Sequence, residues 1–257
     1  MTTTPDNPLD MVPDPFAGNA FVLPQTNCTE ERKLFFRRMN EIQAVLFIAK
    51  HSFDVCKEKY DKNIIPKLPS GANTPIKIEM NGGNFIVLPA FRITEMVTNG
   101  INILTRQAFV MFYGSFETYL FQLFERSFPL VGITENILDK SRDILMLKKW
   151  DGKFCKMNEV FGIDYKAGNL IDHFKTFEMD FEGKKHKNPL TFLDEIAQVR
   201  HRIVHASSLL ENNKLIFIDM NIFHSFFGFF FLLTDYIDER FGSKFGFTRT
   251  AINPAKA

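Results

Sequence analysis

The sequence predicts an all-α protein, an up-and-down helical bundle. Apolar side chains recur at helical spacing over residues 29–62, 91–128 and 222–240, and these runs are too long for strands. The chain has 257 residues and 45% of them are apolar, which is ample for a buried core. Phe occurs 30 times against one Trp and five Tyr, so we expect helices packed through aromatic rings, with or without an apolar dimer interface.

Residues 1–27 are predicted to form a flexible N-terminal arm. The segment carries Pro5, Pro8, Pro13, Pro15 and Pro24 and little periodic pattern. It has no basic region followed by an apolar run, so we do not expect it to be a signal peptide.

Residues 28–90 are predicted to be an extension made of one long helix and a β-hairpin. The helix opens on Glu30 and Glu31, whose charges suit the positive end of the helix dipole. In the later part, residues 76–80 alternate apolar and charged side chains, and an Asn-Gly-Gly-Asn turn precedes a second apolar run at 85–88. This pattern is typical of a β-hairpin.

Residues 91–245 are predicted to be a helical domain. A second long helix spans Phe91 to about Phe128 and buries an aromatic face. The remaining expected elements are shorter helices at Asn136–Trp150, Phe154–Phe161 and Leu170–Phe177, a basic loop at 183–189, a helix at Leu190–Leu210, a turn with a short strand at 211–221, and a closing aromatic helix at Ile222–Arg240.

Composition excludes several classes of protein. The formal charge of +1 shows none of the overall basicity of a dedicated nucleic-acid binder. Cys28, Cys56 and Cys155 are widely spaced, which indicates reduced thiols in a cytoplasmic protein and no zinc ribbon. The apolar run Ile222–Leu233 is shorter than the about 20 residues of a membrane span, so it is interpreted as a buried helix. No nucleotide-binding glycine motif is present, and no cofactor is expected.

The helix at 190–210 contains one local anomaly. Asn188-Pro189 ahead of it is a helix start, and its apolar residues, Val204 and Ala197 included, form one arc of about 160°. Arg200 projects into the middle of that arc, where an unpaired guanidinium costs on the order of several kcal/mol. It therefore needs an anion or a wet cleft. Glu117, in the aromatic stretch of the second long helix, is either a surface carboxylate or a buried anion that Arg200 could meet.

Residues Arg200 to His205, with the sequence RHRIVH, resemble the signature of the HEPN superfamily. That signature is an Arg, a polar residue, a short spacer and a His near the end of a helix. These all-α domains occur in many toxin, phage-defence and RNA-processing ribonucleases. The resemblance covers roughly residues 91–241, where FYGSFETYLFQLF supplies the aromatic helix that usually precedes the motif. It implies a HEPN-like bundle in which Arg200 and His205 are catalytic and His201 is the polar auxiliary.

The implied reaction suits these residue types. Metal-independent RNA cleavage needs a base for the ribose 2′-hydroxyl, an acid for the leaving 5′-oxygen, and a cation for the phosphorane. Histidine, with an ordinary pKa of about 6.5, serves as acid or base, and the Arg fork fits phosphate oxygens. The products would be a 2′,3′-cyclic phosphate and a 5′-hydroxyl.

Arg200 and His205 are separated by about 7.5 Å of helix rise and about 140° of rotation, so they do not share one narrow face. The resemblance implies a homodimer with facing motifs, and we therefore predict that the active groups come from two chains.

RNA is the expected substrate. Five basic residues against two acidic ones between 184 and 205 give a local positive charge, and we expect phosphate contacts from Lys184, Lys185, Lys187 and Arg202. An antitoxin protein is a further partner that the resemblance implies.

Three alternatives remain open. The first is a non-catalytic HEPN-like module that binds RNA or a nucleotide, or only dimerises. The second is a zinc site on the i,i+4 pair His201 and His205, with Asp194, His186 or His224 as a third ligand, which Arg202 disfavours. The third is purely structural: Arg200 pairs with a core carboxylate, and the histidines stabilise the C-terminal end of the helix.

Overall fold

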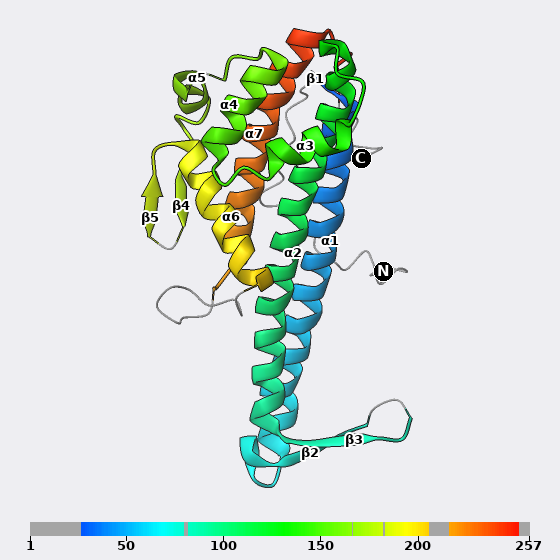
Figure 1. Cartoon of the computed structure of the whole chain (residues 1–257). Helices are drawn as coiled ribbons and strands as arrows, with labels where there is room; N and C mark the ends of the chain where they lie inside the picture. The colour runs from blue at the N-terminus through cyan, green and yellow to red at the C-terminus, as the bar shows by residue number, and fades with distance from the viewer. Residues whose placement is uncertain (1–26, 80–81, 166, 182, 206–215, 252–257) are drawn as a thin grey trace, which may run out of the picture.

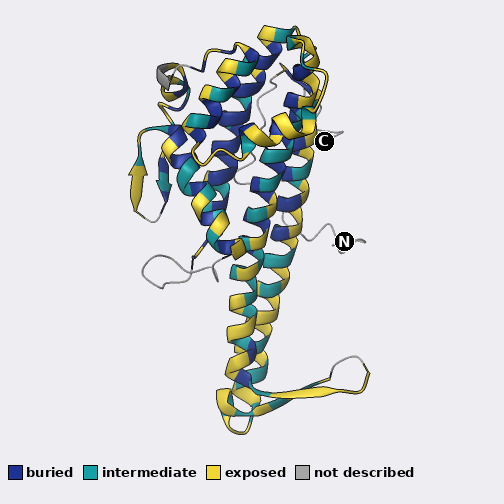
Figure 2. Cartoon of the chain, in the orientation of Figure 1, coloured by how far each residue is buried: buried dark blue, intermediate teal, exposed yellow. Residues whose placement is uncertain are grey.

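The computed structural model describes residues 27–79, 82–165, 167–181, 183–205 and 216–251. Helices hold 73% of them, which confirms the predicted all-α class. In Figure 1, α1 (Glu30–Lys59) and α2 (Ala90–Ser127) run antiparallel and side by side. Their upper halves belong to a head that contains the other helices, and their lower halves project from it alone. Figure 2 shows that buried residues gather in the head, whereas the projecting part is mostly exposed. We call this projecting part the stalk.

Helix α1 and the hairpin confirm the elements expected between residues 28 and 90. The Thr29 hydroxyl caps α1 by accepting from the Arg32 amide at 3.3 Å. Short helical turns at Tyr60–Ile64, Ile65–Lys67 and Gly71–Asn73 follow α1. Strand β2 (Pro75–Glu79) then pairs antiparallel with β3 (Phe85–Pro89), with Ile78 opposite Ile86.

The aromatic residues of α2 pack against α7 (Met220–Phe245), and this contact explains much of the Phe content. The rings of Phe109 and Phe226, and of Phe116 and Phe230, lie 4.9 Å apart between centroids. Phe112 contacts three rings of α7 at 5.3–5.9 Å. Tilted and edge-on ring pairs of this kind stabilise a core beyond the area that they bury.

Among the described helices, α7 has the length and apolar composition of a membrane span. In its most apolar window 61% of the residues are buried inside the head. The stretch at 222–233 is therefore part of a buried helix, as predicted, although α7 continues past Arg240 to Phe245.

The shorter helices differ from the prediction. They are α3 (Ile137–Leu145), α4 (Trp150–Phe161) and α5 (Ala167–His173), with the turn Phe128–Val131 before them. The single helix expected over 136–150 is wrong, because the chain leaves helical geometry after α3 and Lys149 is extended. Trp150 instead opens α4, where the side chain of Asp194 accepts from its amide. This long-range cap is invisible to local periodicity.

The basic loop expected at 183–189 is also wrong in part. Strands β4 (Met179–Phe181) and β5 (Lys184–His186) form a second hairpin, and Gly183 supplies the positive φ of 78° that its turn requires.

Helix α6 (Pro189–His205) follows, and the Asn188 side chain accepts from the Leu190 amide at 2.9 Å, as expected for its start. The predicted end of this helix at 206–210 lies outside the described residues, as do residues 211–215. Residues 216–219 form no strand, and Asp219 caps α7.

Arg32 ties the first half of α1 into the head. Its side chain is fully buried, with an ion pair to Asp235 and a hydrogen bond to the Phe231 carbonyl at 3.2 Å. The guanidinium also lies over the rings of Phe36 and Phe231, at 4.9 and 5.2 Å. Beside it, β1 (Asn27–Cys28) pairs with β6 (Thr250–Ala251). The predicted extension therefore contributes its first half to the main core.

We predict that Arg32→Ala lowers the free energy of unfolding by about 3–5 kcal/mol, because it leaves a carboxylate without its buried partner. Urea denaturation measures the loss. The control is Arg92→Ala, which removes an exposed i,i+3 pair with Glu95 and should cost less than about 1 kcal/mol. Equal losses in the two variants would contradict the structural role of Arg32.

Candidate functional site

Arg200, which the helical periodicity placed in the apolar arc of α6, points toward α2. Its guanidinium carbon lies 6.0 Å from the centre of the Tyr113 ring. The residue is half-buried, and its Nε atom is buried without a hydrogen-bond partner. A guanidinium nitrogen in that state is a donor for which the described residues supply no acceptor, and a buried donor of this kind in a native structure calls for an explanation.

Glu117 lies one helical turn after Tyr113 and faces the same region. Burial raises the pKa of its carboxyl, while the positive charges of Arg200 and Lys153 lower it. Glu117 and Arg200 therefore interact through space, yet they form no ion pair or hydrogen bond with each other or with another described residue. The closed ion pair of the structural alternative is not formed here.

Lys153 and Trp150 of α4 complete this region. Lys153 is buried, its ammonium donates to the Leu145 carbonyl at 2.6 Å, and it lies 4.3 Å from the Trp150 ring centre. Burial lowers the pKa of Lys153, and the charges of Glu117 and Asp194 raise it. We call Tyr113, Glu117, Trp150, Lys153, Asp194 and Arg200 the polar cluster.

Asp194 holds α6 against α4. Its Oδ1 accepts from the Trp150 amide at 2.9 Å, and the Trp150 indole in turn donates to the Tyr113 hydroxyl at 3.3 Å. Burial is the main reason that the pKa of Tyr113 is raised, and the nearby Glu117 charge adds to it. These bonds link α2, α4 and α6 and fix the positions of Glu117 and Arg200.

His201 and His205 lie on the other side of α6. Both are exposed, and their ring centres are 4.8 Å apart. The structure thus brings the two histidines together but not onto the face of Arg200, as expected from the 140° between Arg200 and His205. Val204, predicted in the buried arc, is 45% exposed because it lies in the last turn of α6. The shared cleft expected between Arg200 and His205 stays a prediction.

The described residues supply no third ligand for a metal ion on His201 and His205, because no three His, Cys, Asp or Glu residues converge among them. Asp194 is engaged with α4. His186 lies against the Phe192 ring at 5.3 Å, and burial lowers the pKa of both His186 and His224.

The basic residues expected to bind substrate are dispersed. Lys184 forms an ion pair with Glu195 of α6, so its charge is partly compensated. Lys185 and Lys187 are exposed near the start of α6, and Arg202 is half-buried near its end.

Sequence reasoning missed Tyr113, Trp150 and Lys153. Lys153 carried a usable signal, because it falls between Trp150, Phe154 and Met157 on the apolar face of α4. It is the same anomaly that singled out Arg200. The hydrogen bonds of Trp150 carried no such signal, since their partners lie 37 and 44 residues away.

Comparisons with known proteins identify no relative. No protein-family model matches the chain, and no curated protein or solved structure is significantly similar to it. The resemblance to HEPN domains therefore depends on the sequence motif alone.

We predict that Arg200→Ala raises the pKa of Glu117 further, because the variant removes the cation that stabilises its charged form. A carbon-detected NMR titration of the Glu117 carboxyl measures the shift. Lys185→Ala, an exposed change on β5, should leave this pKa unaltered. An ordinary Glu117 pKa, or no response to Arg200→Ala, would contradict the arrangement of the polar cluster.

Proposed function

We propose that this chain is a HEPN-type endoribonuclease that cuts RNA without a metal ion, by attack of the ribose 2′-hydroxyl. The observation that carries the proposal is Arg200, a cation directed inward with a buried Nε that no described acceptor satisfies. An arginine kept for stability alone would be expected to hold a partner such as Glu117 or Asp194. The RHRIVH motif supplies the histidines that the reaction needs.

The motif residues take distinct roles in this reaction. Arg200 remains partly exposed, so its fork binds a phosphate at the edge between α6 and α2. His205 exchanges protons with the 2′-hydroxyl or the leaving 5′-oxygen. His201, 4.8 Å away between ring centres, orients His205 or assists the transfer. Lys185, Lys187 and Arg202 contact the RNA backbone, with a smaller contribution from Lys184 because of its pairing with Glu195.

The resemblance also suggests the biological setting. We propose a cytoplasmic enzyme of a toxin–antitoxin or phage-defence system, in which an antitoxin protein restrains the ribonuclease. The HEPN-like domain would extend over residues 91–245, with α2 and α6 as the helices that carry its site.

A second candidate is a non-catalytic module that binds RNA or a nucleotide. The separate faces of Arg200 and His205, together with the compensated charge of Lys184, favour it. Such a module would hold a phosphate on Arg200 but would not place an acid or base beside it.

We predict that the purified chain cleaves labelled RNA in EDTA. Arg200→Ala and His205→Ala should each lose at least about 100-fold in rate, as expected for a transition-state cation and an acid–base group. His201→Ala should lose about tenfold, because an orienting group contributes less than the acid or base itself. The control is His51→Ala, an exposed histidine of α1, which should retain full activity.

The outcomes separate the candidates. RNA binding without cleavage would select the non-catalytic module. Cleavage that EDTA abolishes would select the metal alternative. Unchanged activity in His205→Ala would remove the assigned role of that residue.

A further inference from the structure

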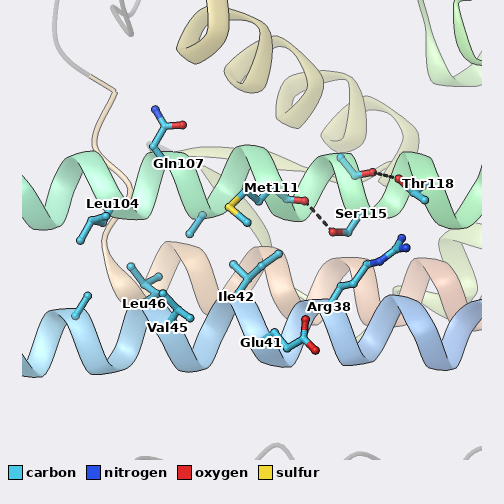
Figure 3. A pocket seen from close by; sticks show the side chains of 13 residues that line it. Arg38, Glu41, Ile42, Val45, Leu46, Leu104, Gln107, Met111, Ser115 and Thr118 are labelled. Atoms are coloured by element: carbon cyan, nitrogen blue, oxygen red, sulfur yellow. Dashed lines mark hydrogen bonds between the residues drawn. The ribbon is translucent and has the colours of Figure 1, made fainter.

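The α1–α2 pair has an open apolar groove on the face away from the rest of the head. Figure 3 shows this groove, whose volume is about 660 Å³, with Ile42, Val45 and Leu46 on one side and Leu104 and Met111 on the other. Val45 is 68% exposed and Met111 is 59% exposed. Two large apolar side chains at one groove mark a surface suited to binding another molecule.

This groove is separate from the polar cluster. Met111 precedes Tyr113 by two residues, so their side chains point about 160° apart around α2. The groove and the candidate site thus occupy opposite sides of the same helix.

A self-complementary pattern runs along the exposed ridge of α1 beside the groove. This ridge consists of four residues at intervals of four, three and four, which is helical spacing on one side of α1: Leu34, Arg38, Glu41 and Val45. The order is apolar, basic, acidic, apolar, and it is symmetric about the midpoint between Arg38 and Glu41. Neither Arg38 nor Glu41 forms an ion pair with another described residue.

We propose that this face is the interface between two copies of the chain, packed antiparallel about a two-fold axis that crosses α1 between Arg38 and Glu41. Two-fold symmetry pairs Arg38 with the partner's Glu41, and Glu41 with the partner's Arg38. The same register places Leu34 against the partner's Val45, at the mouth of the partner's groove. A net charge of zero along the ridge suits a second copy better than an acidic or a basic partner.

The available area fits a stable but modest dimer. Two helices side by side are about 20 Å wide, and the 20 residues of α1 at 30–49 span about 30 Å. The contact would bury about 600 Å² on each copy, or about 1,200 Å² in total, at the lower end of specific interfaces.

The interface is independent of the proposed ribonuclease activity. It leaves the two α6 helices on the outer sides of the dimer, because Arg200 contacts the opposite side of α2. The cross-chain pair of Arg200 and His205 that the resemblance implies would then need a different contact.

Sedimentation velocity of the full chain over a concentration series, with charge-exchange variants, tests the proposal. Arg38→Glu and Glu41→Arg should each weaken dimerisation at least about tenfold, because each places like charges opposite one another. The double variant should restore the dissociation constant to within about threefold, since the pairs are re-formed with exchanged signs. Val45→Glu should give a monomer, and Arg92→Glu, an exposed change on α2 away from the ridge, should have no effect.

Circular dichroism of each variant verifies that the helices are intact. A full chain that is monomeric at about 100 μM, or a dimer that ignores Arg38→Glu, would overturn the interface. Failure of the double variant to restore dimerisation would overturn the antiparallel register.

Discussion

The packing of α2 against α7 is the contact on which the rest of the structure depends. A helix turns about 100° per residue, so fixing one face fixes all the others. Phe112 and Phe116 are fully buried against the rings of α7. This contact directs Tyr113 and Glu117 toward α4 and α6, and it leaves Met111 on the open side. The candidate site and the groove are therefore two consequences of one aromatic interface.

The polar cluster contains charged side chains that are buried or half-buried, and only some of them have a hydrogen-bond partner. It contains two cations and two carboxylates, so its formal charge is zero. Asp194 is engaged with the Trp150 amide, and Lys153 with the Leu145 carbonyl. Glu117 and Arg200 are the two charged members that no hydrogen bond joins to another described residue. They are thus the groups of the cluster that can respond to a ligand, and an anion on Arg200 would satisfy a donor whose burial is otherwise costly.

Periodicity alone predicted the long helices, the hairpin of β2 and β3, and the inward direction of Arg200, because these depend on residues close in sequence. The break between α3 and α4 was missed, since Asp194 caps α4 from a distant helix. Strand β5 lies within the loop predicted at 183–189, because strands of three residues leave almost no alternating pattern. Lys153 could have been found from its place on an apolar helix face. The network that links it to Glu117 could not, because it depends on how α2, α4 and α6 pack.

We propose that Arg200 and His205 support cleavage through the ribose 2′-hydroxyl. The most direct test of this proposal is cleavage, in EDTA, of an RNA that carries a single 2′-deoxy nucleotide at the mapped scissile position. We predict that the all-ribose RNA yields a 2′,3′-cyclic phosphate and a 5′-hydroxyl, and that the substituted RNA is not cut at that position, because the attacking group is missing. Cleavage at the 2′-deoxy position at an undiminished rate would contradict it.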